Sequence, residues 1–536
     1  MLGCAATPQQ GPPEADEGPE GAITTDPGLP GAWPQTAGQV VAAGEAGRAP
    51  EARRPDWVPW LIALAVFGAY SAISISRYVR LDPGSWDLGI FTEDVKQFAH
   101  LRAPIVDIRG AGFNLLGDHF QPIVALIAPF FLLAPSPVTL LLAQALLTAL
   151  SVIPVCRAAT ATLGTAAGWM IGAAYGFSWG LQQTIDFDFH EIAFAVPLLA
   201  CSLSALLRGR TRAAALWAAP LVFVKEDQGF TVAAIGIIIM INARRSRIRA
   251  AGDDSAPAHS TRDADTGLFL MFWGIAWSLA AIVVIIPHFN VAHQYPYWND
   301  GGVIGIGTGH HAMSGLLSQV TEAYRQKLDT TALILLPVAF LALRSPLALV
   351  AVPRLALRII STDSSFWGTA WHYNATVMPI VFIAAIDALA RIGAGRAAAG
   401  KARRMLATAT VRLIPVAMLA IAAVLAFRFP LDGLWNPQTY AIDQHVRAED
   451  DAMARVPDGV TAETTLTMLA PLAARDDTFW IGTSPNPAPE YIVFDDSNSG
   501  WSPEPANVLA FVESRHPGAT YRQIFLANDV YVFRRS

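Results

Sequence analysis

Residues 57–76 read WVPWLIALAVFGAYSAISIS, and residues 86–91, a short loop further on, read WDLGIF. The first stretch is apolar and about 20 residues long, which is enough for one helix to cross a membrane. Three arginines precede it at positions 48, 53 and 54, so the positive-inside rule predicts a cytoplasmic N-terminus and an external loop from residue 77. WDLGIF therefore places an acid, Asp87, at the outer face. A carboxylate beside the bilayer is energetically costly, which predicts a functional role for it.

Composition fixes the broad class of the protein. Of its 536 residues, 53% are hydrophobic and only 15% are charged, and the mean hydropathy is +0.38. These values indicate a polytopic membrane protein. The net charge of −6 argues against a nucleic-acid partner, which requires a basic surface. Three cysteines far apart in the sequence give no disulfide framework and no zinc pattern.

Hydrophobic runs and basic loops alternate along residues 57–429. Tracing them predicts an α-helical transmembrane domain with about 11 membrane-spanning helices and large external loops at residues 77–137 and 288–330. Several expected spans are short. Residues 122–134, which are followed by two prolines, are expected to be half-inserted or to lie along the membrane.

The two ends of the chain differ from this pattern. Residues 1–50 are rich in Gly, Pro, Ala and Glu and predict a disordered cytoplasmic tail. Residues 430–536 predict a small extracytoplasmic α/β domain. Its expected strands are at residues 479–481, 491–494 and 530–533, and a helical pattern spans residues 507–515.

The first external loop is expected to contain a helix in the membrane interface. Phe91, Val95 and Phe98 recur at helical spacing, opposite polar residues that include Asp94. A solvated helix of no special role, with Asp87 as its N-cap, is the alternative. Asp118 and His119 close the loop just before Pro122, so they either cap the following helix or bind substrate.

A second polar cluster lies at residues 186–191. In an extended segment Asp186, Asp188 and His190 would share one face, with phenylalanines between them. Together with Glu191 they are candidate ligands for a divalent cation such as Mg²⁺ or Mn²⁺. A hydrogen-bonded surface turn is the alternative.

Two further segments supply cations on the outer side. Lys225 is followed by Glu226 and Asp227, an arrangement that is either an internally paired cluster or a phosphate site with an acid beside it. Arg354 and Arg358 are four residues apart and share a helix face. Guanidinium groups there either bind a lipid phosphate or reach to lipid headgroups.

The segment Trp371-His372-Tyr373 lies on the same side as these clusters. His372 is either a packed interfacial histidine or, with Tyr373, part of a substrate site near Asp363. Acids, histidines and cations from separate loops thus converge on one face of the bilayer. That convergence predicts an active site.

The motifs WDLGIF, GDHFQP (residues 117–122), DFHE (188–191), KED (225–227) and WHY (371–373) together resemble DUF2079, an uncharacterised family of bacterial membrane proteins. The resemblance covers about residues 57–430, and the C-terminal domain is similar to the family's usual tail. The family is grouped with the GT-C glycosyltransferases, multi-span enzymes that use polyprenyl-phosphate-linked sugars. The essential acid of that superfamily lies in the first external loop, which implies a catalytic role for Asp87. Roles for Asp188, His190 and Glu226 are implied by the family motifs alone.

The predicted function is therefore sugar transfer in the bacterial plasma membrane, from a polyprenyl-phosphate carrier to a cell-envelope glycan, lipid or protein. Asp87 would take the acceptor's proton, while Lys225, Arg354, Arg358 or a metal ion would stabilise the departing phosphate. Direct displacement predicts inversion at the anomeric carbon. The alternatives are a transporter or flippase of a lipid-linked or anionic substrate, and a membrane scaffold. The sequence argues against the first because its charges gather at one surface rather than at the bilayer midplane.

Overall fold

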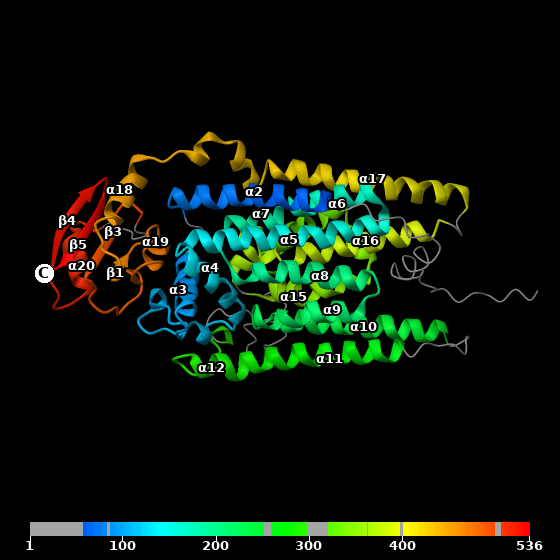
Figure 1. Ribbon diagram of the computed structural model, residues 1–536, viewed down its shortest axis with the longest axis horizontal. Coiled ribbons are helices and arrows are strands. Elements are labelled where there is room, and N and C mark those ends of the chain that lie inside the picture. The colour runs from blue at the N-terminus through cyan, green and yellow to red at the C-terminus, as the bar shows by residue number, and fades with distance from the viewer. Residues whose placement is uncertain are drawn as a thin grey trace, which may run out of the picture. The chain divides into compact units, whose positions relative to one another are not determined.

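A computed structural model describes residues 57–82, 86–250, 259–298, 320–361, 363–396, 400–498 and 505–536 (Figure 1). The predicted disordered tail at residues 1–50 lies outside the described residues. The described chain is mainly helical, with a small sheet near its C-terminus, as the sequence predicts.

Six helical segments of the described chain are long and apolar enough to cross a membrane. They are α2 (Val58–Val79), α5 (Pro137–Leu163), α10 (Gln228–Ala250), α11 (His259–Ala280) continued by a π-turn and α12 (Ile286–Phe289), α16 (Val377–Ala394), and α17 (Lys401–Ala426). Helix α16 is central, since 78% of its apolar window is buried, against 22% for α17.

The remaining helices are short or broken. Three are apolar, and each consists of an α-helix and a 3₁₀ turn. They are residues 122–133 with α4 (Ala128–Leu133), residues 191–207 with α8 (Ala195–Leu207), and residues 211–223 with α9 (Thr211–Ala218). The others before the C-terminal domain are α3 (Asp87–Ala99), α6 (Thr165–Gly176), α7 (Trp179–Asp186), α14 (Tyr324–Leu335) and α15 (Val352–Ile360). The number of spans therefore stays a prediction.

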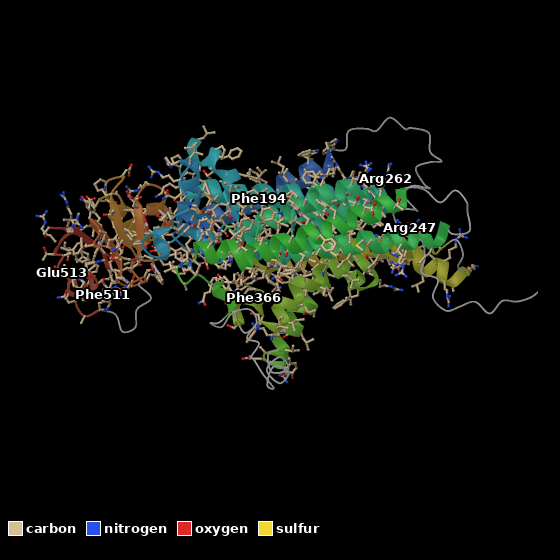
Figure 2. The ribbon with its side chains drawn as sticks, turned by 90° about the horizontal axis from the view of Figure 1, so that it is seen from below. Phe194, Arg247, Arg262, Phe366, Phe511 and Glu513 are labelled. Carbon is tan, nitrogen blue, oxygen red and sulfur yellow. The ribbon has the colours of Figure 1, made fainter. Side chains whose placement is uncertain are left out.

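Several helix ends differ from those predicted. Helix α5 runs past Arg157, and α10 and α17 include arginines that were expected in cytoplasmic loops. Arginine is a good helix former, so a basic flank continues a helix beyond its apolar run. In Figure 2, Arg247 of α10 and Arg262 of α11 lie at the same end of this helix pair, while Phe511 and Glu513 of the C-terminal domain lie toward the other end.

The C-terminal domain is a five-stranded sheet with the order β2-β1-β3-β5-β4. Its strands are β1 (Thr461–Thr464), β2 (Asp477–Trp480), β3 (Tyr491–Asp495), β4 (Tyr521–Ala527) and β5 (Val530–Arg535). Strand β1 pairs in parallel with β2 and β3, whereas β5 is antiparallel to β3 and β4. Helices α18 (Gln444–Met453), α19 (Leu469–Ala473) and α20 (Val508–Arg515) accompany the sheet. The predicted α/β character is confirmed, although the short strand β1 and strand β4 were not expected.

The C-terminal domain packs against α3. Trp86 and Trp480 meet edge to face with ring centroids 4.6 Å apart, and the Lys96 ammonium donates to the Asp476 carbonyl at 2.6 Å. A Cβ atom added at Gly89 would lie 2.8 Å from a methyl carbon of Leu469. The glycine of WDLGIF is therefore where α19 approaches α3 most closely.

Helices α10 and α11 form the closest helix pair, and glycines lie along their contact. A Cβ added at Gly274 would come within 2.2 Å of the carbonyl oxygen of Gly229, and one at Gly236 within 2.5 Å of that of Gly267. Small residues let two backbones touch, and in a membrane this packing replaces much of the hydrophobic driving force.

Gly274→Ala is expected to lower the midpoint of thermal unfolding in detergent, because the added methyl group forces the two backbones apart. Overpacking of this kind costs about 1–3 kcal/mol. Gly68→Ala in α2 is the matched control, since its added Cβ meets nothing within 4 Å and alanine favours a helix by about 1 kcal/mol. Equal midpoints for the two variants would contradict the proposed backbone contact.

Candidate active site

Helix α3 begins at Asp87, and its carboxylate pairs with a histidine from another segment. The Oδ2 atom lies 3.3 Å from Nε2 of His190. The Asp87 side chain is 26% exposed and that of His190 only 5% exposed. The N-cap position belongs to Trp86, which forms no side-chain cap, so N-capping does not explain Asp87. The partly exposed Asp87 carboxylate is thus in contact, on its buried side, with the His190 imidazole.

His190 is held by the side chain of Gln144 from α5. The Gln144 carboxamide donates to the Thr184 and Asp188 carbonyls and accepts the His190 backbone N–H at 3.0 Å. The imidazole stacks on Phe187 at 4.7 Å and on His372 at 4.0 Å between ring centroids. Packing on the ring and bonds to the backbone leave His190 little freedom to move away from Asp87.

The expected extended segment at residues 186–191 is wrong, because Asp186 is the last residue of helix α7 and Asp188 adopts a left-handed φ of 61°. Asp186 pairs with Arg77 at 3.0 Å, whereas Glu191 pairs with Lys225 at 2.9 Å. The shared face that suggested a metal site at Asp186, Asp188, His190 and Glu191 is therefore absent. A requirement for a divalent cation stays a prediction.

The three charged residues that precede α10 do not pair with one another. Lys225 contacts Glu191, Glu226 contacts His119 at 2.9 Å, and Asp227 forms an ion pair with Arg354 of α15. Glu226 also accepts the Phe120 N–H at 3.2 Å. Internal pairing of the cluster is thus excluded, and this loop instead connects three distant segments.

His119 is the centre of a second set of contacts. Its Nε2 lies 2.9 Å from the Tyr297 hydroxyl, which also donates to Asp118 at 3.0 Å. Arg109 pairs with Asp118 at 3.2 Å, and Tyr295 donates to Glu226 at 3.3 Å. Asp118 and His119 therefore bind to neighbouring side chains rather than cap a helix.

These contacts form one acid–base cluster. Tyr373 interacts electrostatically with Lys225, Arg354 and Asp87, and Glu191 interacts with both His190 and His119, so the two sets of pairs are neighbours. The cluster contains Asp87, Asp118, His119, His190, Glu191, Lys225, Glu226, Asp227, Arg354, His372 and Tyr373. The structure thus brings together most of the residues predicted from separate loops.

Burial and charge set the ionisation of the Glu226–His119 pair. Burial opposes the charged form of Glu226, but His119, its hydrogen bond and Lys225 outweigh burial and lower the pKa of Glu226 to about 2. Burial and Lys225 likewise oppose the charged form of His119, yet Glu226 and Asp118 raise the pKa of His119 above its usual value. Each partner therefore favours the charged form of the other.

Arg358 was predicted to bind phosphate, but the structure gives it other partners. Its guanidinium donates to the carbonyls of Phe366 and Gly368, each at 2.8 Å, and to the side chain of Asn374 at 2.7 Å. Three of its nitrogens thus hold the segment that leads to His372. Arg358 orders this loop, and Arg354 is the arginine that joins the acid–base cluster.

Two clefts lie near these groups. The first, of about 330 Å³ including space open to solvent, is lined by Trp86, Leu88 and Asp188 on one side and by residues 466, 467 and 469–471 of the C-terminal domain on the other. Asp87 lies between two of these lining residues. The second, of about 250 Å³, includes Lys327 and Arg358.

Several residues of the site were not found from the sequence. Four of them lie in segments that contain no recognisable motif, and only the fold brings them to the cluster: Arg109, Gln144, Tyr295 and Tyr297. Asp94 was expected on the polar face of α3, yet it is buried and neither carboxyl oxygen has a hydrogen-bond partner. Burial, together with Glu191, raises the pKa of Asp94 well above its usual value.

The sequence matches a family of membrane proteins, and the fold is similar to solved structures. The model of the DUF2079 family, described as a predicted membrane protein, matches residues 77–531. No curated protein matches the sequence. ArnT from Cupriavidus metallidurans, solved bound to undecaprenyl phosphate, is similar over 89% of this chain and 97% of its own, with a TM-score of 0.51 and 14% identity.

Two further solved structures are less similar. Apo ArnT covers 88% of this chain and 97% of its own, at a TM-score of 0.44 and 13% identity. Arabinosyltransferase EmbB from Mycobacterium smegmatis covers 82% of this chain and 42% of its own, at a TM-score of 0.38 and 13% identity. The likeness to undecaprenyl-phosphate-bound ArnT, at 14% identity, concerns the fold alone.

Glu226→Gln is expected to destabilise the protein in a pH-dependent way. The pKa of His119 is raised in the folded protein. Its ion pair therefore contributes its full stabilisation below the pKa of an unfolded histidine, about 6.5, and this stabilisation is lost as pH rises through the folded-state pKa. Glu226 has a lowered pKa of about 2 in the folded protein, so its charge stabilises the fold above the unfolded pKa of about 4.3. The loss of stability should therefore be largest between about pH 4.5 and 6.5.

Midpoints of thermal unfolding, measured in detergent from about pH 5 to 9 on both proteins, test this expectation. In a His119→Asn background the effect of Glu226→Gln should no longer change over this range. A constant difference between wild type and Glu226→Gln would instead show that His119 is neutral in the fold.

Proposed function

We propose that this chain, which belongs to the DUF2079 family of predicted membrane proteins, transfers a sugar from a polyprenyl-phosphate carrier to an acceptor at the outer face of the membrane. One observation carries the proposal: a partly exposed carboxylate, Asp87, is backed by the buried His190 in the same cluster as two cations, Lys225 and Arg354. A general base and cations for a departing phosphate are the groups that this reaction needs.

The nature of the carrier is supported by the fold. ArnT, which shares the fold over nearly its whole length, was solved with undecaprenyl phosphate. A lipid phosphate of that class would extend its chain along the membrane-spanning helices and present its charged end to the cluster. The acceptor would be a glycan, lipid or protein of the cell envelope.

The reaction is a single displacement at the anomeric carbon. The acceptor oxygen forms a bond to that carbon while the bond from the carbon to the phosphate oxygen breaks, and the carrier phosphate leaves with the electron pair. The proton of the acceptor hydroxyl passes to Asp87, and base assistance of this kind contributes about 10² to 10⁴ in rate. Attack opposite the leaving group inverts the anomeric configuration.

His190 acts as a positioning residue for this base. It contacts Asp87 at 3.3 Å but is itself buried, so it orients the carboxylate rather than meeting the acceptor. Its bonds through Gln144 and its stacking on His372 fix that orientation. A fixed carboxylate loses less entropy on reaching the reacting geometry.

Lys225 and Arg354 would bind the phosphate by exchanging partners. In the free protein each cation pairs with a carboxylate, Glu191 or Asp227 respectively. An ammonium group has three donors and a guanidinium group five, so both retain capacity for a phosphate oxygen. Negative charge that develops on the leaving group would draw these donors away from the carboxylates.

The proposed orientation follows from the ends of the helices. Lys225, Glu226 and Asp227 precede α10, whereas four arginines lie in its last turns, at residues 244, 245, 247 and 249. Helix α17 likewise begins with a basic segment and leads to the C-terminal domain. The positive-inside rule places the basic ends in the cytoplasm, so the cluster and the C-terminal domain face outward.

Asp87→Asn is expected to lower transfer of radiolabelled sugar from polyprenyl phosphate to a membrane-extract acceptor by about 10² or more, because the amide cannot accept the proton. Binding of the carrier should persist. Asp432→Asn, at an exposed acid beyond α17, is the matched control and should retain full transfer. Wild-type protein that binds carrier but transfers nothing to any acceptor would favour a lipid transporter instead.

Arg354→Gln and Asp227→Asn separate a phosphate-binding arginine from a purely structural ion pair. If Arg354 binds the carrier, Arg354→Gln weakens carrier binding about tenfold or more, the value of a charge-assisted hydrogen bond. Asp227→Asn releases the arginine and leaves binding equal or tighter. Titration of both proteins with polyprenyl phosphate in nanodiscs measures this, and equal weakening in both variants would show a structural role only.

A further inference from the structure

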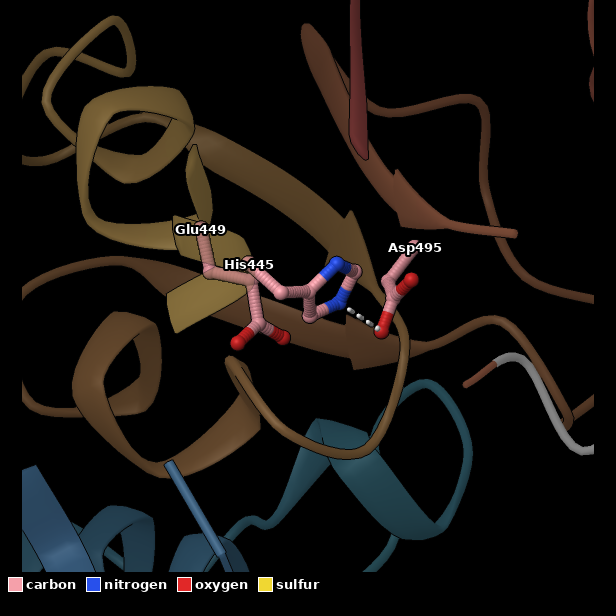
Figure 3. A group of neighbouring side chains, drawn as sticks. All are labelled: His445, Glu449 and Asp495. Atoms are coloured by element: carbon pink, nitrogen blue, oxygen red, sulfur yellow. Dashed lines mark ion pairs between the residues drawn. The ribbon is translucent and has the colours of Figure 1, made fainter. Parts of the chain in front are cut away.

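Three side chains of the C-terminal domain meet at the end of its central strand β3 (Figure 3). His445 and Glu449 are four residues apart on α18 and so share one helix face. Asp495 ends strand β3, and its Oδ2 lies 3.1 Å from Nε2 of His445. One potential ligand atom from each residue lies within 4.8 Å of the other two.

Burial makes this group different from a surface charge cluster. Glu449 is 1% exposed and Asp495 is completely buried. The Oε1 atom of Glu449 has no hydrogen-bond partner, although the Thr467 hydroxyl lies close to this carboxyl group and interacts with it. Two buried carboxyl groups thus face one imidazole, and one of their oxygens, Oε1 of Glu449, has no hydrogen-bond partner.

The surroundings hold the group in place. Oδ1 of Asp495 accepts hydrogen bonds from the backbone N–H groups of Ser497 and Asn498 and from the Ser497 hydroxyl, which leaves Oδ2 directed at His445. His445 also forms a hydrogen bond with the backbone of Asn528, in the turn between β4 and β5. Outer contacts of this kind orient the ligands of metal sites.

We propose that His445, Glu449 and Asp495 bind a divalent transition metal of the zinc class. An imidazole nitrogen with two carboxylate oxygens suits zinc, whereas calcium and magnesium favour sites made of oxygen alone. Ligands on one zinc ion, each about 2.0–2.2 Å from it, lie at most about 4.4 Å apart. A small side-chain rotation therefore closes the site around the ion.

The metal would join three parts of the C-terminal domain. Helix α18 is the first helix after the membrane-spanning α17, Asp495 belongs to the centre of the sheet, and Asn528 to its edge hairpin. Residues 466, 467 and 469–471, which line the first cleft, follow β1 in the same sheet. Bound metal thus fixes the position of α18 against the sheet that carries one wall of that cleft.

The test uses the full chain in detergent, with its affinity tag removed and its metal stripped by a chelator. After dialysis against zinc, elemental analysis should find about one equivalent bound to wild type and to Asp451→Asn, a control at an exposed acid on the same helix. Glu449→Gln and His445→Ala should bind zinc more than about tenfold more weakly, since loss of even an outer contact costs about 10- to 100-fold.

A stability readout separates a lost ligand from a damaged fold. Without metal, Glu449→Gln should unfold at the wild-type temperature or above, because the amide replaces a buried carboxyl group that has an unpaired oxygen. Zinc should raise the midpoint of wild type and leave that of Glu449→Gln unchanged. Wild type without stoichiometric zinc, equal zinc in Glu449→Gln, or magnesium bound in place of zinc would overturn the proposal.

Discussion

Charged side chains that leave water must find partners, and this requirement governs the arrangement of the membrane domain. Four segments contribute charges to the acid–base cluster, and each charge pairs with one from another segment: residues 87–119, the turn after α7, the loop before α10, and helix α15. Removal of one member leaves its partner buried and uncompensated, which costs several kcal/mol. Segments more than 100 residues apart in the chain are thereby held at one place, as the Glu226 contacts with His119 and Phe120 show.

The same pairing arranges the groups on which the proposed chemistry depends. Asp87 is partly exposed and its partner, His190, is buried, while Lys225 and Arg354 each pair with a carboxylate that, in the proposed mechanism, a phosphate replaces. The C-terminal domain takes part as well. Its helix α19 approaches α3 at Gly89, and its residues form one wall of the cleft whose other wall includes Trp86 and Leu88, the neighbours of Asp87 in the sequence. The family match extends over this domain, which fits a shared role.

Sequence patterns predicted what depends on local periodicity. Helix α2 and strands β2, β3 and β5 follow apolar runs. The loops of the cluster are predicted from their acids, because acids beside a membrane are costly. The partners could not be predicted, since pairing depends on how distant helices pack. Asp186 was placed with Asp188 on the assumption of an extended segment, but α7 continues through it to reach Arg77. Asp94 and Tyr297 lacked any local signal, because burial and contact with the cluster arise only in the folded chain.

The position of the carrier phosphate tests the account most directly. A cryo-electron microscopy structure of the protein in nanodiscs, with undecaprenyl phosphate bound, would locate it. We expect the phosphate to contact Lys225 and Arg354, with space beside Asp87 for the acceptor hydroxyl. A phosphate bound instead at the second cleft, beside Lys327, or near the bilayer midplane would contradict the assignment of the acid–base cluster as the active site.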